Sequence, residues 1–117
     1  MAKRIATLLI ADMLDAIRKV ELYVNTMTQE EFLNDEKTRD AVTRNIEIIG
    51  EAANQLPDLF YTEHPEIAWR SIIGMRNRLI HEYFAVNIVV LWQTVINSLP
   101  LFKRDLSDLL AILDKRL

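Results

Sequence analysis

The chain has 117 residues, no cysteine and a formal net charge of −3. This length suits one domain, which we expect to cover residues 1–117, and the lack of cysteine excludes disulfides and thiolate chemistry. No apolar run resembles a signal peptide or a membrane span, so we expect a cytoplasmic protein with no membrane partner.

The composition favours helices, because hydrophobic residues make up 50 % of the chain while Gly occurs twice and Pro three times. Apolar residues recur at three- and four-residue steps from Ile5 to Val24, which predicts an amphipathic first helix. The sequence of residues 28–31, Thr-Gln-Glu-Glu, is a capping box that predicts a short helical piece. Asp35 and the residue before it offer the N-cap of a second long helix, from Glu36 to residue 56, where Pro57 ends it.

Residues 58–64 are expected to form a connector whose aromatic side chains pack on the core. Pro65 suits the first turn of a third helix, running from about residue 66 towards Tyr83. A fourth helix is predicted over residues 88–97, with Asn87 as its N-cap.

Pro100 is expected to kink or divide the chain, and a last helix should run from residue 101 to about residue 113. Short connections between such helices predict an all-α, up-and-down bundle of four to five helices. No repeat or low-complexity segment is present.

Residues 76–83, Arg-Asn-Arg-Leu-Ile-His-Glu-Tyr, are the most informative stretch of the chain. No Asp or Glu occurs from Ile67 to His81, while three arginines fall in that range. Arginine can bind a phosphate bidentately, and histidine can transfer protons near neutral pH. One basic patch on an acidic protein suits a small anionic site better than a long phosphate groove.

Arg76 falls in the middle of the apolar stripe of the third helix. A charge at such a position must be paired or must face an interface, because burying it alone is very costly. One interpretation is a structural ion pair with Glu47 or Glu51 of the second helix. The other is that Arg76 lines a polar site at a subunit boundary, oriented by that carboxylate.

His81 lies five residues after Arg76, about 140° around an ideal helix, so one chain does not readily aim both side chains at one atom. A distorted helix end or a long reach of the arginine would bring them together within one chain. Pairing across a twofold axis would do so between two chains, which suggests a homodimer without demanding one. Tyr83 shares the face of Arg76 and is either an ordinary core-edge tyrosine or a functional one. Arg78 is either solvated or steers a phosphate, and Asn77 either bonds substrate or caps a bend.

Three segments together carry a family resemblance: residues 40–52, residues 64–69 and residues 74–81. With the pattern Arg-four residues-His-any-Tyr, they make the chain similar to the HepT-like branch of the HEPN superfamily. The resemblance spans about residues 13–99. It implies a helical-bundle homodimer that acts as a metal-independent endoribonuclease without cofactor, and that serves as the toxin of a toxin–antitoxin pair.

Carried over residue by residue, the resemblance makes Arg76 and His81 the catalytic pair and Tyr83 the regulatory residue. A cognate minimal nucleotidyltransferase, the antitoxin, would adenylylate Tyr83 and block RNA by bulk and charge. His81 from one subunit would act as base and its mate as acid, while Arg76 stabilises charge on the phosphate. The acidic Glu82 departs from the small residue often found in relatives. It would lower RNA affinity or raise the pKa of His81.

Two alternatives remain open from the sequence. A non-catalytic nucleotide-binding or adaptor subunit, partnering a minimal nucleotidyltransferase, would use the same Arg–His pocket. A purely structural bundle would leave Arg76 in the apolar stripe without a reason. A neighbouring gene for a small nucleotidyltransferase would favour the toxin or the adaptor over the structural bundle.

Overall fold

The computed structural model describes residues 2–81 and 88–115, with side chains at all of these except positions 2, 78–81 and 115. Every regular element in these ranges is a helix and none is a strand, which confirms the all-α prediction. The elements are α1 (Ala2–Val24), α2 (Gln29–Leu33), α3 (Glu36–Asn54), α4 (Asp58–Glu63), α5 (Trp69–His81), α6 (Ile88–Gln93), a π-helical turn η2 (Thr94–Ser98) and α7 (Leu99–Lys115).

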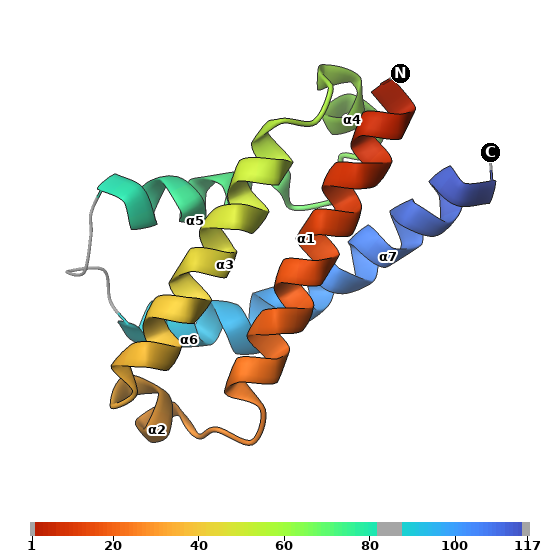
Figure 1. The fold of residues 1–117 in the computed structure, drawn as a ribbon. Helices are drawn as coiled ribbons and strands as arrows, with labels where there is room; N and C mark the ends of the chain where they lie inside the picture. The colour runs from red at the N-terminus through yellow and green to blue at the C-terminus, as the bar shows by residue number, and fades with distance from the viewer. Residues whose placement is uncertain (1, 82–87, 116–117) are drawn as a thin grey trace.

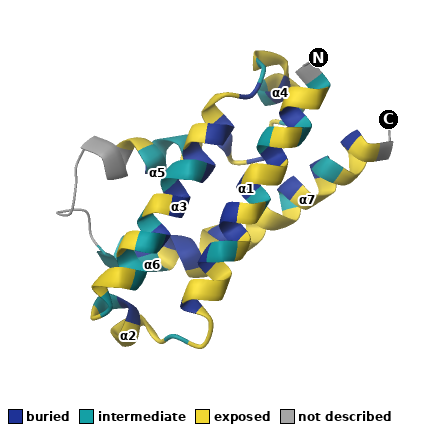
Figure 2. Cartoon of the chain, in the orientation of Figure 1, coloured by how far each residue is buried: buried dark blue, intermediate teal, exposed yellow. Residues whose placement is uncertain are grey.

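Helices α1 and α3 run side by side in opposite directions and form the centre of the molecule (Figure 1). Helix α5 crosses α3 on one side, and α7 packs along α1 on the other. Their apolar faces meet inside, so that the buried residues follow the inner side of each long helix (Figure 2). None of the helices in the described ranges is both long and apolar enough to cross a lipid bilayer.

The caps predicted before α2 and α3 are both present. The Glu31 amide donates to Thr28 Oγ1 at 3.2 Å, and the Thr28 amide donates to Glu31 Oε1 at 2.9 Å, which completes the capping box. At the start of α3, the Thr38 amide donates to Asp35 Oδ1 at 3.0 Å. This bond to the carboxylate holds the pKa of Asp35 below its usual value.

The prediction of a connector at residues 58–64 was wrong, since Asp58–Glu63 forms helix α4. This helix packs on the core through the buried Phe60, and the Tyr61 hydroxyl donates to the Ala53 carbonyl at 2.6 Å. Burial of the Tyr61 ring raises its pKa. These contacts stabilise a helix too short to be detected from periodicity.

The third helix begins at Trp69, three residues later than predicted. The indole Nε1 of Trp69 donates to the His64 carbonyl at 3.0 Å, and the Ile67 amide donates to the same carbonyl at 3.2 Å. With Ile67 buried, the backbone of residues 65–68 therefore closes into a turn, and Pro65 lies in it instead of opening the helix.

Pro100 changes the kind of helix rather than dividing the chain. From Ile88 to Lys115 the helical run is continuous, but Thr94–Ser98 is a π-helical turn. The Leu99 amide donates to the Thr94 carbonyl, five residues back. A widened turn before proline accommodates its ring and its missing N–H. The N-cap predicted at Asn87 lies outside the described residues.

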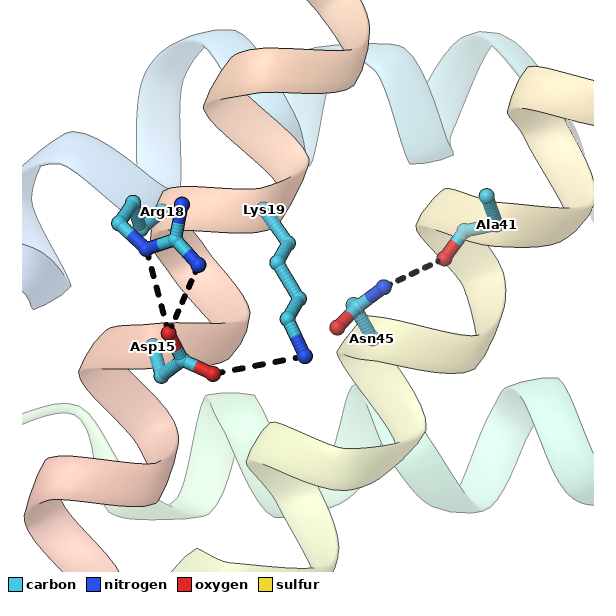
Figure 3. Close-up of polar contacts among 5 residues, drawn as sticks. All are labelled: Asp15, Arg18, Lys19, Ala41 and Asn45. Atoms are coloured by element: carbon cyan, nitrogen blue, oxygen red, sulfur yellow. Dashed lines mark hydrogen bonds and ion pairs between the residues drawn. The ribbon is translucent and has the colours of Figure 1, made fainter.

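One polar side chain is buried between α1 and α3. The Asn45 amide nitrogen donates to the Ala41 carbonyl one turn earlier, at 2.9 Å (Figure 3). Across the seam on α1, Asp15 forms ion pairs with Arg18 at 3.0 Å and Lys19 at 3.4 Å (Figure 3). The hydrogen bond from Arg18 is the main cause of the lowered pKa of Asp15.

Candidate functional site

The candidate site begins with a close approach of two helices at Gly50. A Cβ added there would overlap the Cβ of Arg76, and would lie 2.8 Å from the Arg76 Cγ and 3.3 Å from the Ile72 carbonyl oxygen. Only glycine therefore lets α5 lie this close to α3. The aliphatic part of Arg76 packs onto the surface that the glycine leaves bare.

With this packing, the Arg76 guanidinium lies beside Glu51 of α3. Its Nη2 donates to Glu51 Oε2 at 2.6 Å, and its Nη1 donates to Asn77 Oδ1 at 2.9 Å. The side chain is 23 % exposed, while that of Glu51 is 51 % exposed. The Nε atom is buried and has no hydrogen-bond partner among the described residues. A guanidinium has five N–H donors, so these bonds leave donors for an incoming oxyanion.

Glu51 is itself held from the other side. Gln55, the C-cap residue of α3, donates through Nε2 to Glu51 Oε1 at 3.3 Å. The two carboxylate oxygens therefore have different donors, Gln55 and Arg76. This arrangement fixes the carboxylate and, through it, the direction of the guanidinium.

Of the two carboxylates predicted as partners of Arg76, the structure pairs Glu51. Glu47 lies 3.6 Å from Arg44 on its own helix instead. Four residues separate the two glutamates, so both lie on one side of α3, and the register of α5 selects the later one.

The other predicted site residues follow Arg76 in the sequence. Asn77 accepts the hydrogen bond from Arg76, so its side chain orients the arginine. Arg78 and His81 belong to α5 by their backbone, and Tyr83 lies outside the described residues. The backbone is α-helical from Arg76 to His81, so the two positions stay about 140° apart around the axis.

Arg76 also lies at the edge of a groove of about 480 Å³ between α1 and α3. Three carboxylates line this groove, from Asp12, Glu47 and Glu51, against the two guanidiniums of Arg44 and Arg76. Its charges nearly balance, and leave a slight excess of negative charge. Anions are therefore attracted to the Arg76 guanidinium itself and not to the groove as a whole.

Within the described ranges, no three His, Asp or Glu side chains gather in a way that could hold a metal ion. At the Arg76 site, the guanidinium cation is held by the Glu51 carboxylate and the Asn77 side-chain amide. Such a group can bind a phosphate and stabilise negative charge that develops on it.

Sequence reasoning missed Gly50 and Gln55. The signal for Gly50 was present, because a glycine inside an amphipathic helix costs stability unless something approaches closely. Gln55 carried no such signal, since a glutamine near a helix end is ordinary.

The chain matches the family model described as HepT-like, "Ribonuclease HepT-like", over residues 13–109. It is 46 % identical over 92 residues to "Probable ribonuclease HepT" of Thermococcus cleftensis, covering 79 % of this chain and 84 % of that protein. It is 34 % identical over 110 residues to "Putative RNase MJ0127" of Methanocaldococcus jannaschii, covering 94 % and 91 %. No solved structure matches the chain.

The all-helical fold and the family match over residues 13–109 therefore define a HEPN-type protein. The chain belongs to the HepT-like family, whose described activity is that of a ribonuclease.

Proposed function

We propose that this protein is a metal-independent endoribonuclease toxin of a HEPN/minimal-nucleotidyltransferase toxin–antitoxin pair. Arg76 and His81 form its catalytic site at a homodimer interface, and adenylylation of Tyr83 silences it. The observation that carries the proposal is the anchoring of Arg76. A guanidinium placed in an apolar stripe, fitted onto Gly50 and held by Glu51 and Asn77, is a preorganised oxyanion site.

The helical register supports the homodimer part of the proposal. In one chain, the positions of Arg76 and His81 point in directions about 140° apart, and α5 is regular between them. A twofold axis near this helix brings the arginine of one subunit and the histidine of its partner to the same phosphate.

In the proposed reaction, one His81 takes the proton of the ribose 2′-hydroxyl, and the oxygen attacks the adjacent phosphorus. The bond from phosphorus to the 5′-oxygen breaks, and the second His81 gives that oxygen a proton. The products are a 2′,3′-cyclic phosphate and a 5′-hydroxyl. Arg76 stabilises the extra negative charge on the phosphate during the attack.

The test is cleavage of total tRNA and a structured mRNA in excess EDTA, by the wild type and by Arg76→Ala and His81→Ala. Arg4→Ala is the control, because Arg4 is exposed at the start of α1 and does not line the groove beside Arg76. We expect the wild type and the control to cleave and to leave 2′,3′-cyclic phosphate ends, while the two site variants do not.

Absence of cleavage by folded wild type, with Tyr83 shown unmodified by mass spectrometry, would contradict the proposal. It would favour the non-catalytic nucleotide-binding or adaptor subunit. Size determination by light scattering tests the homodimer separately. Co-expression with a cognate minimal nucleotidyltransferase tests adenylylation of Tyr83, which would add to the mass of the protein.

A further inference from the structure

A second groove, of about 580 Å³, lies on the other side of α5, between this helix and the segment formed by α6 and η2. Its rim is polar, with Arg70 and Ser71 from α5 facing Gln93, Asn97 and Ser98. Val90 and Met75 contribute apolar surface to its floor. The volume lies within the range of ligand-binding clefts.

The charge of this groove differs from that of the groove beside Arg76. No carboxylate is among the described residues that line it, and Arg70 is the charged residue there. No ion pair engages Arg70 within the described ranges. On a chain of net charge −3, an exposed and unpaired guanidinium surrounded by neutral hydrogen-bonding groups is suited to an anionic ligand.

Gly74 in the middle of α5 has no packing reason to be glycine. A Cβ added there would meet nothing within 4 Å, and its φ is not positive. Glycine in a helix interior costs about 1 kcal/mol relative to alanine. A glycine that lowers helix stability but relieves no steric overlap is expected where a ligand must approach the backbone closely.

The opposite wall is equally unusual, because it is built from the π-helical turn before Pro100. The buried Thr94 hydroxyl donates back to the Val90 carbonyl at 2.9 Å, so it is satisfied inside the wall. The wider turn leaves Asn97 and Ser98 exposed at the rim. Single π-helical turns within α-helices occur frequently at functional sites.

The register of α5 connects this groove with His81. Positions 70, 74 and 78 follow at four-residue steps, and position 81 lies eleven residues, or about three turns, after Arg70. Position 81 therefore shares the helix face of the groove, whereas position 76 lies on the face towards α3.

We propose that this groove binds the sugar–phosphate backbone of single-stranded RNA next to the bond that is cut. Arg70 pairs with a phosphate, Ser71, Gln93, Asn97 and Ser98 bond phosphate and ribose oxygens, and Gly74 lets the strand lie against α5. The inference rests on the proposed function for the identity of the ligand. It adds a substrate-binding surface outside the Arg–His signature.

The test measures binding of a fluorescent single-stranded oligoribonucleotide by anisotropy, in EDTA, with His81→Ala as the parent so that no RNA is cut. Arg70→Ala removes the charge, Gly74→Leu fills the open space, and Arg4→Ala is the matched charge control. Circular dichroism verifies the fold of each variant.

We expect Arg70→Ala to raise Kd about fivefold to tenfold, and to reduce the slope of log K against log salt by about 0.7, the value for one phosphate contact on a single strand. Gly74→Leu should raise Kd by a similar factor, and Arg4→Ala should leave Kd unchanged.

Unchanged RNA affinity in both groove variants would overturn the inference. Failure of the proposed function is distinguished by the cleavage assay. A wild type that cuts no RNA but whose RNA binding still depends on Arg70 and Gly74 would refute the nuclease and keep the groove.

Discussion

The two faces of α5 each carry an arginine, and the surroundings of the two arginines differ. On the face towards α3, Arg76 is packed on Gly50, paired with Glu51 at 2.6 Å and set beside a groove that holds three carboxylates. On the face towards α6 and η2, Arg70 lies exposed in a groove whose described lining has no carboxylate.

If both proposals hold, one helix separates two tasks that both need positive charge. A guanidinium whose direction is fixed by neighbours is suited to stabilise charge at one point. A guanidinium that is exposed and unpaired is suited to attract and hold a polyanion, with less demand on geometry. The two glycines follow the same division, since a side chain packs on Gly50 while open space lies over Gly74.

The largest expected effect separates the two arginines by kinetics. Arg76→Ala should lower kcat for RNA cleavage by about 10²–10³, the usual cost of losing one preorganised oxyanion donor. Arg70→Ala should raise KM about fivefold to tenfold and leave kcat nearly intact, because it removes binding common to the ground and transition states. Initial rates over a range of RNA concentration measure both. A fall in kcat of equal size in the two variants would contradict the division of tasks.

The two glycines should respond in opposite directions to alanine. Gly50→Ala places a Cβ against the Cβ of Arg76, so we expect the free energy of unfolding to fall by about 1–3 kcal/mol, as for an overpacked core. Gly74→Ala meets no atom and should raise that free energy by about 0.4–1 kcal/mol.

Urea denaturation of the two variants beside the wild type measures both changes. A stabilised Gly50→Ala would mean that α3 and α5 do not approach as closely as described. A destabilised Gly74→Ala would mean that a neighbouring group occupies the open space in solution.

The pair of glutamates on α3 provides a finer comparison. Glu51→Gln keeps the shape of the side chain but removes the charge that Arg76 contacts, so we expect a severalfold loss of kcat. Because Glu51 is half exposed, the free energy of unfolding should change by less than about 1 kcal/mol. Glu47→Gln is the matched control, since Glu47 lies beside Arg44 and not Arg76. Equal kcat values for the two variants would remove Glu51 from the site.

The smallest expected effect concerns Asp35, the N-cap residue of α3, which lines neither groove. Asp35 has a pKa lowered from 3.8 by its bond to the Thr38 amide, so the unfolded chain binds its proton more readily. The stabilisation is therefore present above about pH 4 and is lost as the pH falls through the lower, folded pKa.

Asp35→Asn keeps a capping oxygen but does not titrate. Its melting temperature should therefore fall less than that of the wild type between pH 5 and pH 3. Asp108→Asn, at an exposed position on α7, is the control. A wild-type melting curve that moves with pH no more than the Asp35→Asn curve would contradict the assignment.

Much of the fold followed from local sequence rules. The capping box at Thr28, the N-cap at Asp35 and the long amphipathic helices α1 and α3 depend on residues within a few turns of each other, and all were predicted. Helix α4, the late start of α5 at Trp69 and the π-helical turn before Pro100 were not. Each depends on a bond or packing contact that the local pattern does not contain, such as the bond from the Trp69 indole to the His64 carbonyl.

The same distinction holds at the site. The sequence by itself determined that the protein is helical, that Arg76 interrupts an apolar stripe, and that Glu47 and Glu51 are the carboxylates available to it, because helical periodicity and the cost of burying a charge are local rules. Tertiary structure decided that Glu51 is the partner, that Gly50 sets the distance between α3 and α5, and that Gly74 opens a second groove. The first two outcomes depend on how closely α3 and α5 approach each other, which the missing Cβ of Gly50 allows, and the third depends on how α6 and η2 pack beside α5.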